Sequence, residues 1–179
     1  MSELIYEKQN NVAYLFLNRP ERRNAIDTKM SQQLIEYLEL FKADQSARVL
    51  VLSGKGDKAF CSGIDLKESR EDEAAWKKRS SSRGRLFEAI IETWKPVICA
   101  INGAAVGAGC EIALACDCRI AVKNSLIGLP EAKRGMGASF GAALLPKMIS
   151  PSVAAYLLYT GKLIDSSEAL NIGLINEVV

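Results

Sequence analysis

Histidine is absent from the 179 residues of this chain. Its absence excludes a Ser-His-Asp triad, a Cys-His pair, an HExxH zinc site and any histidine general base within this sequence. Any proton transfer by these residues must therefore use carboxylates, lysine, tyrosine, cysteine or water held by the backbone.

Cysteine is sparse, with five residues at irregular spacing. Cys116 and Cys118 are too close for a CxxC motif and no second pair accompanies them, so we expect no metal site. We expect Cys61, Cys99, Cys110 and Cys116 to be buried as small hydrophobic side chains. This usage is typical of a reducing compartment, and the first ten residues resemble no secretory leader, so a cytoplasmic location is expected.

A dominant charge of one sign is also missing. Lysine and arginine total 23 against 21 acidic residues, which leaves a net charge of +2. We therefore expect neither nucleic acid nor a membrane as a partner. With 49% apolar and 25% charged residues, the composition is that of a soluble globular protein, and the length predicts one domain spanning residues 1–179.

Short apolar runs alternate with helical patterns along the chain, which predicts an α/β fold. Asn10 and Asn11 are typical of a hairpin turn, and Asp27 or Thr28 of a helix N-cap. Residues 71–94 have a helical pattern with a local basic cluster at Lys77–Arg85, which is either a solvated helix face or a phosphate site. The expected strands are Leu4–Lys8, Val12–Leu17, Arg48–Ser53, Val97–Ile101 and Ile175–Val179, and the first long helix runs from the Asp27 cap to about Ala43.

The segment Val97–Cys116 has the length of a membrane span and contains a GxxxG spacing. Asn102, Glu111 and three glycines argue against a span, because a carboxylate inside the bilayer is costly. We instead expect a buried strand, a glycine-rich turn and a buried helix from about Gly109.

The stretch from Gly137 to Gly141 matches the GxSxG pattern of a nucleophilic serine. No apolar strand precedes Ser139 and no histidine is present to activate it, so a glycine-rich helix start is the better interpretation. A serine hydrolase would need a histidine from outside this sequence. The sequence also has two Gly-Lys pairs, Gly54-Lys55 and Gly161-Lys162, but neither has the other residues of a phosphate-binding loop.

Two carboxylates lie in apolar surroundings, Glu111 after a glycine-rich turn and Glu131 after Pro130. A buried glutamate is costly unless it is paired or used. The residues alone leave structural and functional roles equally open. In one site the two would have separated pKa values and could serve as base and acid for adding or removing water across an activated double bond. The small-residue turns at Phe60–Gly63 and Val106–Gly109 are either plain tight turns or the two halves of an oxyanion hole.

At these residues the chain resembles the crotonase superfamily, the enoyl-CoA hydratase/isomerase family. The similar segments occur in order and cover nearly the whole chain. They are NRP with NA at residues 18–25, AFCSGIDLKE at 59–68, KPVICAINGAAVGAGCE at 95–111, DCRIAVKNSLIGLPE at 117–131 and the segment 161–179.

The resemblance implies a fold of repeated ββα units with two roughly perpendicular sheets surrounded by helices. It also implies an acyl-CoA thioester substrate, no cofactor beyond the coenzyme A of that substrate, and a homotrimer or dimer of trimers. The family usually continues beyond Val179 into a C-terminal helical segment that covers the active site and helps trimer packing. The resemblance therefore does not by itself imply activity or assembly for residues 1–179.

Carried over by position, the resemblance gives catalytic roles to four residues. The N–H groups of Ser62 and Ala108 would form the oxyanion hole, although Ala108 replaces a glycine usual in the family. Glu111 would deprotonate water and Glu131 would protonate the α-carbon, giving hydration of a 2-enoyl-CoA or the reverse dehydration. The expected acyl-CoA-binding residues are Arg22, Ala25, Ser62, Gly63, Ile64, Asp65, Gly107, Ala108, Pro130 and Phe140. Phe140 lies in the stretch 138–142, which departs from a PGxGG-like segment of the family, and it would reshape the acyl pocket.

Three alternatives remain open at this point. An enoyl-CoA isomerase or a hydroxyacyl-CoA dehydratase would keep the fold and change the reaction. A non-catalytic acyl-CoA-binding fragment would keep the binding site alone.

Overall fold

The N-terminal hairpin forms as the sequence predicts. In the computed structural model, which describes residues 2–67 and 85–179, strand β1 (Leu4–Gln9) pairs antiparallel with β2 (Val12–Leu17). Asn10 has a positive φ of 55°, as a two-residue turn requires. Helix α1 (Thr28–Ala43) begins at Asp27, whose side chain accepts a hydrogen bond from the Met30 N–H at 2.8 Å.

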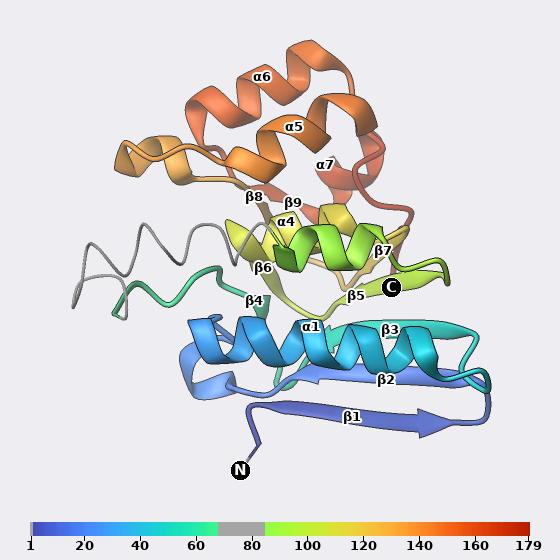
Figure 1. Cartoon of the computed structure of the whole chain (residues 1–179). Coiled ribbons are helices and arrows are strands. Elements are labelled where there is room, and N and C mark those ends of the chain that lie inside the picture. Colours follow the sequence, from blue (N-terminus) through green and yellow to red (C-terminus); the bar gives the residue numbers. More distant parts are fainter. Residues whose placement is uncertain (1, 68–84) are drawn as a thin grey trace.

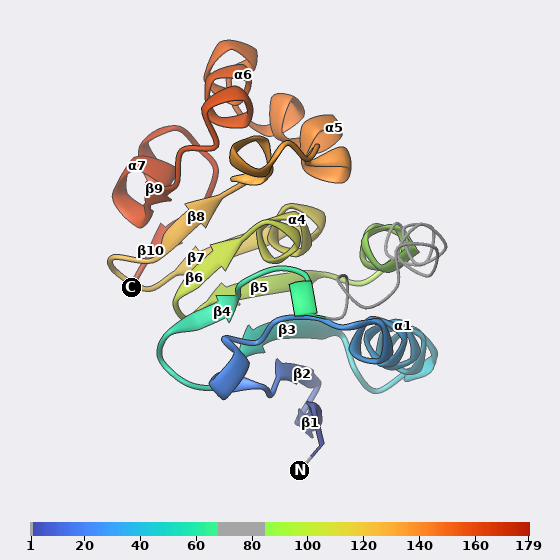
Figure 2. The ribbon, with the colours of Figure 1, turned by 90° about the vertical axis from the view of Figure 1, so that its left-hand side faces the viewer.

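The larger sheet has six strands and is parallel apart from β1. Helix α1 lies alongside it, and its residues Met30, Leu34 and Phe41 are buried (Figures 1 and 2). In spatial order the sheet contains β1, β2, β3 (Val49–Gly54), β5 (Val97–Ile101), β7 (Cys118–Ala121) and β10 (Glu177–Val178).

A second sheet of four short strands connects the segments that form the site. Its order is β4 (Ala59–Cys61), β6 (Ala104–Val106), β8 (Leu126–Gly128) and β9 (Ile164–Asp165). Strand β6 lies where the sequence predicted only a turn, because alanines between glycines carry little strand signal. Its pairing with β4 and β8 brings the two small-residue turns together at one end of this sheet.

The segment Val97–Cys116 divides into β5, β6 and the buried helix α4 (Ala108–Ala115). None of the helices in the described ranges has the length and apolar character that crossing a bilayer demands. Cys61, Cys99, Cys110 and Cys116 are buried and free, as predicted, and burial raises the pKa of the Cys61 thiol to about 12.

The C-terminal third is mainly helical and packs above the second sheet (Figure 1). Residues 85–91 of the expected helix 71–94 are helical, and most of the basic cluster Lys77–Arg85 lies outside the described residues. The remaining elements are the 3-10 turns η1 (Pro20–Arg22) and η2 (Glu131–Arg134) and the helices α5 (Ser139–Met148), α6 (Pro151–Thr160) and α7 (Ser166–Asn171).

The two sheets with surrounding helices that the resemblance implies are confirmed.

Candidate active site

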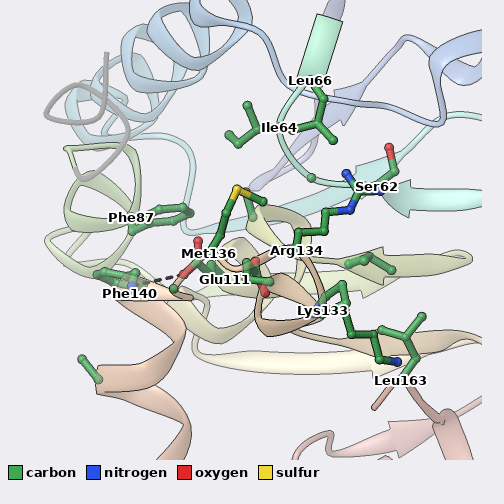
Figure 3. Close-up of a pocket in the computed structure, with 18 residues that line it drawn as sticks. Ser62, Ile64, Leu66, Phe87, Glu111, Lys133, Arg134, Met136, Phe140 and Leu163 are labelled. Atoms are coloured by element: carbon green, nitrogen blue, oxygen red, sulfur yellow. Dashed lines mark hydrogen bonds between the residues drawn. The ribbon is translucent and has the colours of Figure 1, made fainter. Parts of the chain in front are cut away.

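A cavity of about 910 Å³ opens where the second sheet, α4, η2 and α5 meet (Figure 3). Nine of the predicted site residues line it, although they are spread over almost 80 positions of the sequence. They are Ser62, Gly63, Ile64, Gly107, Ala108, Glu111, Pro130, Glu131 and Phe140.

Gly63 allows the two small-residue turns to touch. Its φ is +101°, a conformation that side chains rarely adopt, and a Cβ there would lie 3.0 Å from the Val106 carbonyl oxygen. The same Cβ would lie 3.5 Å from the Ala108 nitrogen. The turn after β4 therefore lies directly against the N-terminus of α4.

The Ala108 N–H is the donor that this helix N-terminus offers. The first intrahelical bond runs from the Glu111 N–H to the Gly107 carbonyl at 2.9 Å, so the N–H groups before it have no acceptor within the helix. Ala108 is not among the residues with positive φ; Gly107 carries that conformation instead, at +59°. The alanine in place of the usual family glycine is thus compatible with the turn.

The predicted donor on the other turn needs correction. The Ser62 N–H donates to the Arg23 carbonyl oxygen at 3.0 Å and is already engaged. Two residues further on, Ile64 lines the cavity, and its N–H has no acceptor among the described residues. Ile64 forms an isolated β-bridge with Ile26. Its two hydrogen bonds run from the Ile26 N–H to the Gly63 carbonyl and from the Asp65 N–H to the Ile26 carbonyl, so the Ile64 N–H takes no part. Ile64, rather than Ser62, therefore has an available N–H.

Glu111 is buried, with 7% of its surface exposed. Its Oε1 accepts hydrogen bonds from the Phe140 N–H at 3.1 Å and the Gly141 N–H at 2.8 Å. Both donors belong to the first turn of α5, so the positive end of that helix faces the carboxylate. These contacts fix the Glu111 side chain at the cavity wall.

Glu131 also lines the cavity, at the first position of η2. A Cβ at Gly107 would lie 3.1 Å from its Oε1, so it is close to the α4 N-terminus. Its Oε2 is buried without a hydrogen-bond partner among the described residues. Burial raises the pKa of the Glu131 carboxyl; a hydrogen bond from its own backbone opposes this, and the charge of Glu111 raises it further.

Three predicted binding residues lie outside the described cavity lining. Arg22 is exposed in η1, and Ala25 is buried with its carbonyl accepting from Arg19. The Asp65 carboxylate pairs with the Arg19 guanidinium at 3.2 Å, so it holds the loop rather than facing the cavity.

Sequence reasoning missed several lining residues, including Phe87, Lys133, Arg134 and Met136. Lys133 and Arg134 come two and three residues after Glu131, so their proximity in sequence was the available signal. No sequence signal marked Phe87 as a cavity residue, since an apolar side chain in a helical pattern is typical of a helix packed against the core. Arg134 extends across the cavity toward Ser62 (Figure 3).

Ser139 begins α5 itself, and the residues before it form the η2 turn and a loop rather than a strand. A nucleophile elbow requires a strand leading into the turn, so the GxSxG stretch is a helix start, as predicted. In residues 2–67 and 85–179, no group of three or more Cys, Asp or Glu side chains is placed to hold a metal ion.

Comparison with known proteins agrees with this architecture. An enoyl-CoA hydratase from Bacillus anthracis superposes with a TM-score of 0.97 at 34% identity, covering 99% of this chain and 70% of that one. The (E)-benzylidenesuccinyl-CoA hydratase of Thauera aromatica is 42% identical over 97% of this chain and 68% of its own length. The crotonyl-CoA hydratase of Syntrophomonas wolfei is 36% identical over 98% of this chain and 68% of its own length.

The fold is that of the crotonase class of enzymes. Residues 7–179 match the enoyl-CoA hydratase/isomerase family, and the chain belongs to that family.

Proposed function

We propose that this chain hydrates a 2-enoyl-CoA thioester. The observation that carries the proposal is the pair Glu111 and Glu131, which line one cavity beside two available backbone N–H groups. The N–H groups of Ile64 and Ala108 would donate to the thioester oxygen, where negative charge develops as water adds.

The two glutamates then take different roles. Glu111, held by the α5 N-terminus, accepts a proton from water as the water oxygen bonds to the β-carbon. The π electrons move toward the thioester oxygen and give an enolate. Glu131, whose raised pKa favours the protonated form, donates its proton to the α-carbon, and the reverse sequence gives dehydration.

The first experiment is an absorbance assay with crotonyl-CoA. We expect the enoyl-thioester absorbance to fall on addition of the chain, with a 3-hydroxyacyl-CoA as the product. An isomerase would instead interconvert 2-enoyl and 3-enoyl thioesters without adding water, and product analysis on both substrates separates the two reactions. Binding of butyryl-CoA with no turnover of any enoyl thioester would favour the non-catalytic alternative.

The trimeric assembly and the cytoplasmic location stay predictions.

The alkaline side of the pH profile is expected to report Glu131. Hydration requires its protonated form, so kcat/KM falls as the pH rises through its pKa, which lies above that of an ordinary glutamate. Because the Glu111 charge contributes to this increase, Glu111→Gln is expected to move the Glu131 titration to lower pH. Carboxyl NMR of the labelled chain measures the titration, and a shift to higher pH would contradict the proposed pairing.

A further inference from the structure

Two aromatic side chains form one wall of the cavity. The rings of Phe87 and Phe140 stack with centroids 4.6 Å apart and an interplanar angle of 24° (Figure 3). Phe87 is only 5% exposed, whereas Phe140 is partly buried. Phe140 is therefore the more exposed of the two and the more available to a ligand, and the Phe87 ring stacks against it.

The position of this wall relative to the reacting atoms follows from one contact. The Phe140 N–H donates to Glu111 Oε1 at 3.1 Å, so the residue that carries the ring also holds the proposed base. Water activated at Glu111 adds to the β-carbon of the substrate. The substituent on that carbon would then lie on the side of the cavity where Phe140 and Phe87 form the wall.

The cavity lining also includes the apolar side chains of Leu66, Met136 and Ala143. The cationic side chains lie elsewhere: Arg134 and Lys133 extend away from the two rings, toward Ser62 and Leu163 (Figure 3). Phe140 thus presents a flat aromatic surface to the cavity. The charged ends of Arg134 and Lys133 do not lie next to it.

We propose that the substrate of this site is a 3-aryl-2-enoyl thioester, whose ring packs against Phe140. Aromatic rings prefer offset-stacked or edge-to-face contacts, and such contacts add to the gain from burying apolar area. A ring attached directly to the β-carbon reaches this wall without intervening methylenes. The orientation of the β-carbon rests on the proposed function.

Binding of saturated thioesters tests the aromatic contact without turnover. We expect 3-phenylpropanoyl-CoA to bind about 2- to 10-fold more tightly than 3-cyclohexylpropanoyl-CoA, which has similar size but no π system. Isothermal titration calorimetry on the unmodified chain gives both dissociation constants. Equal affinities, or tighter binding of the cyclohexyl compound, would overturn the proposal.

Phe140→Leu keeps the backbone N–H that holds Glu111 and removes the ring. We expect it to abolish the phenyl preference. The matched control is Phe16→Leu on β2, whose ring lies outside the cavity under the Lys55 ammonium, and it should keep the preference. A phenyl preference that persists in a folded Phe140→Leu protein would also overturn the proposal.

Turnover separates this inference from the proposed reaction. We expect cinnamoyl-CoA to be hydrated with a higher kcat/KM than crotonyl-CoA. If neither is hydrated while the phenyl preference persists and depends on Phe140, the hydratase proposal fails and the aryl specificity stands. If crotonyl-CoA is hydrated and no phenyl preference exists, the hydratase proposal stands and the aryl specificity fails.

Discussion

Replacing Glu131 by glutamine is expected to slow hydration of crotonyl-CoA by about 10²–10⁴-fold in kcat, the usual contribution of a positioned general acid or base. Glutamine has nearly the same shape but no proton to give to the α-carbon. The Glu131 carboxyl suits that role because burial raises its pKa, and because its Oε2 has no hydrogen-bond partner among the described residues to compete for the proton. Steady-state assays should show the loss in kcat.

Two measurements make the result specific. Butyryl-CoA should still bind, since the proposed oxyanion donors are backbone groups that the substitution leaves in place. Glu168→Gln is the matched control, because this glutamate lies on α7 in an ion pair with Lys162 at 2.7 Å, away from the cavity lining. Unchanged turnover in Glu131→Gln would show that another group donates the proton.

Replacing Ala108 by proline is expected to raise the barrier by about 2.7–4 kcal/mol, or 10²–10³-fold in kcat, the cost of losing one oxyanion donor. Proline has no N–H, and its ring occupies the direction in which the Ala108 N–H points. The substitution suits the fold, because Ala108 is the first residue of α4 and proline is well accepted at the first position of a helix. Stopped-flow or steady-state hydration assays measure the effect.

Ala108→Gly is the matched control for this variant. It keeps the N–H and places at this position the glycine that is usual in the family, so turnover should remain close to that of the original chain. A folded Ala108→Pro protein with undiminished kcat would show that the α4 N-terminus does not stabilise the enolate. Circular dichroism establishes that both variants are folded.

The position of the second proposed oxyanion donor shows a limit of motif matching. The segment AFCSGIDLKE correctly located the turn, but both Ser62 and Ile64 lie on it. Which N–H is available depends on the Arg23 carbonyl, which comes from a loop almost 40 residues earlier and accepts from Ser62. A long-range hydrogen bond of this kind leaves no local pattern in the sequence.

Local chemistry determined much of the fold in advance. The asparagine turn, the Asp27 cap and the apolar run of β5 each depend on a few neighbouring residues, and each forms as predicted. Glu111 and Glu131 could also be selected from the sequence, because a carboxylate among apolar residues is costly unless it is used.

Tertiary structure decided the rest. Strand β6 forms because β4 and β8 supply its hydrogen-bond partners, although its own alanines have little strand preference. The Asp65 carboxylate turns to Arg19 because that cation is folded against it. Phe87 stacks on Phe140 at the cavity wall, and the Glu131 pKa rises only once burial and the Glu111 charge act on it. Each of these outcomes depends on groups that are distant in sequence and adjacent only after folding.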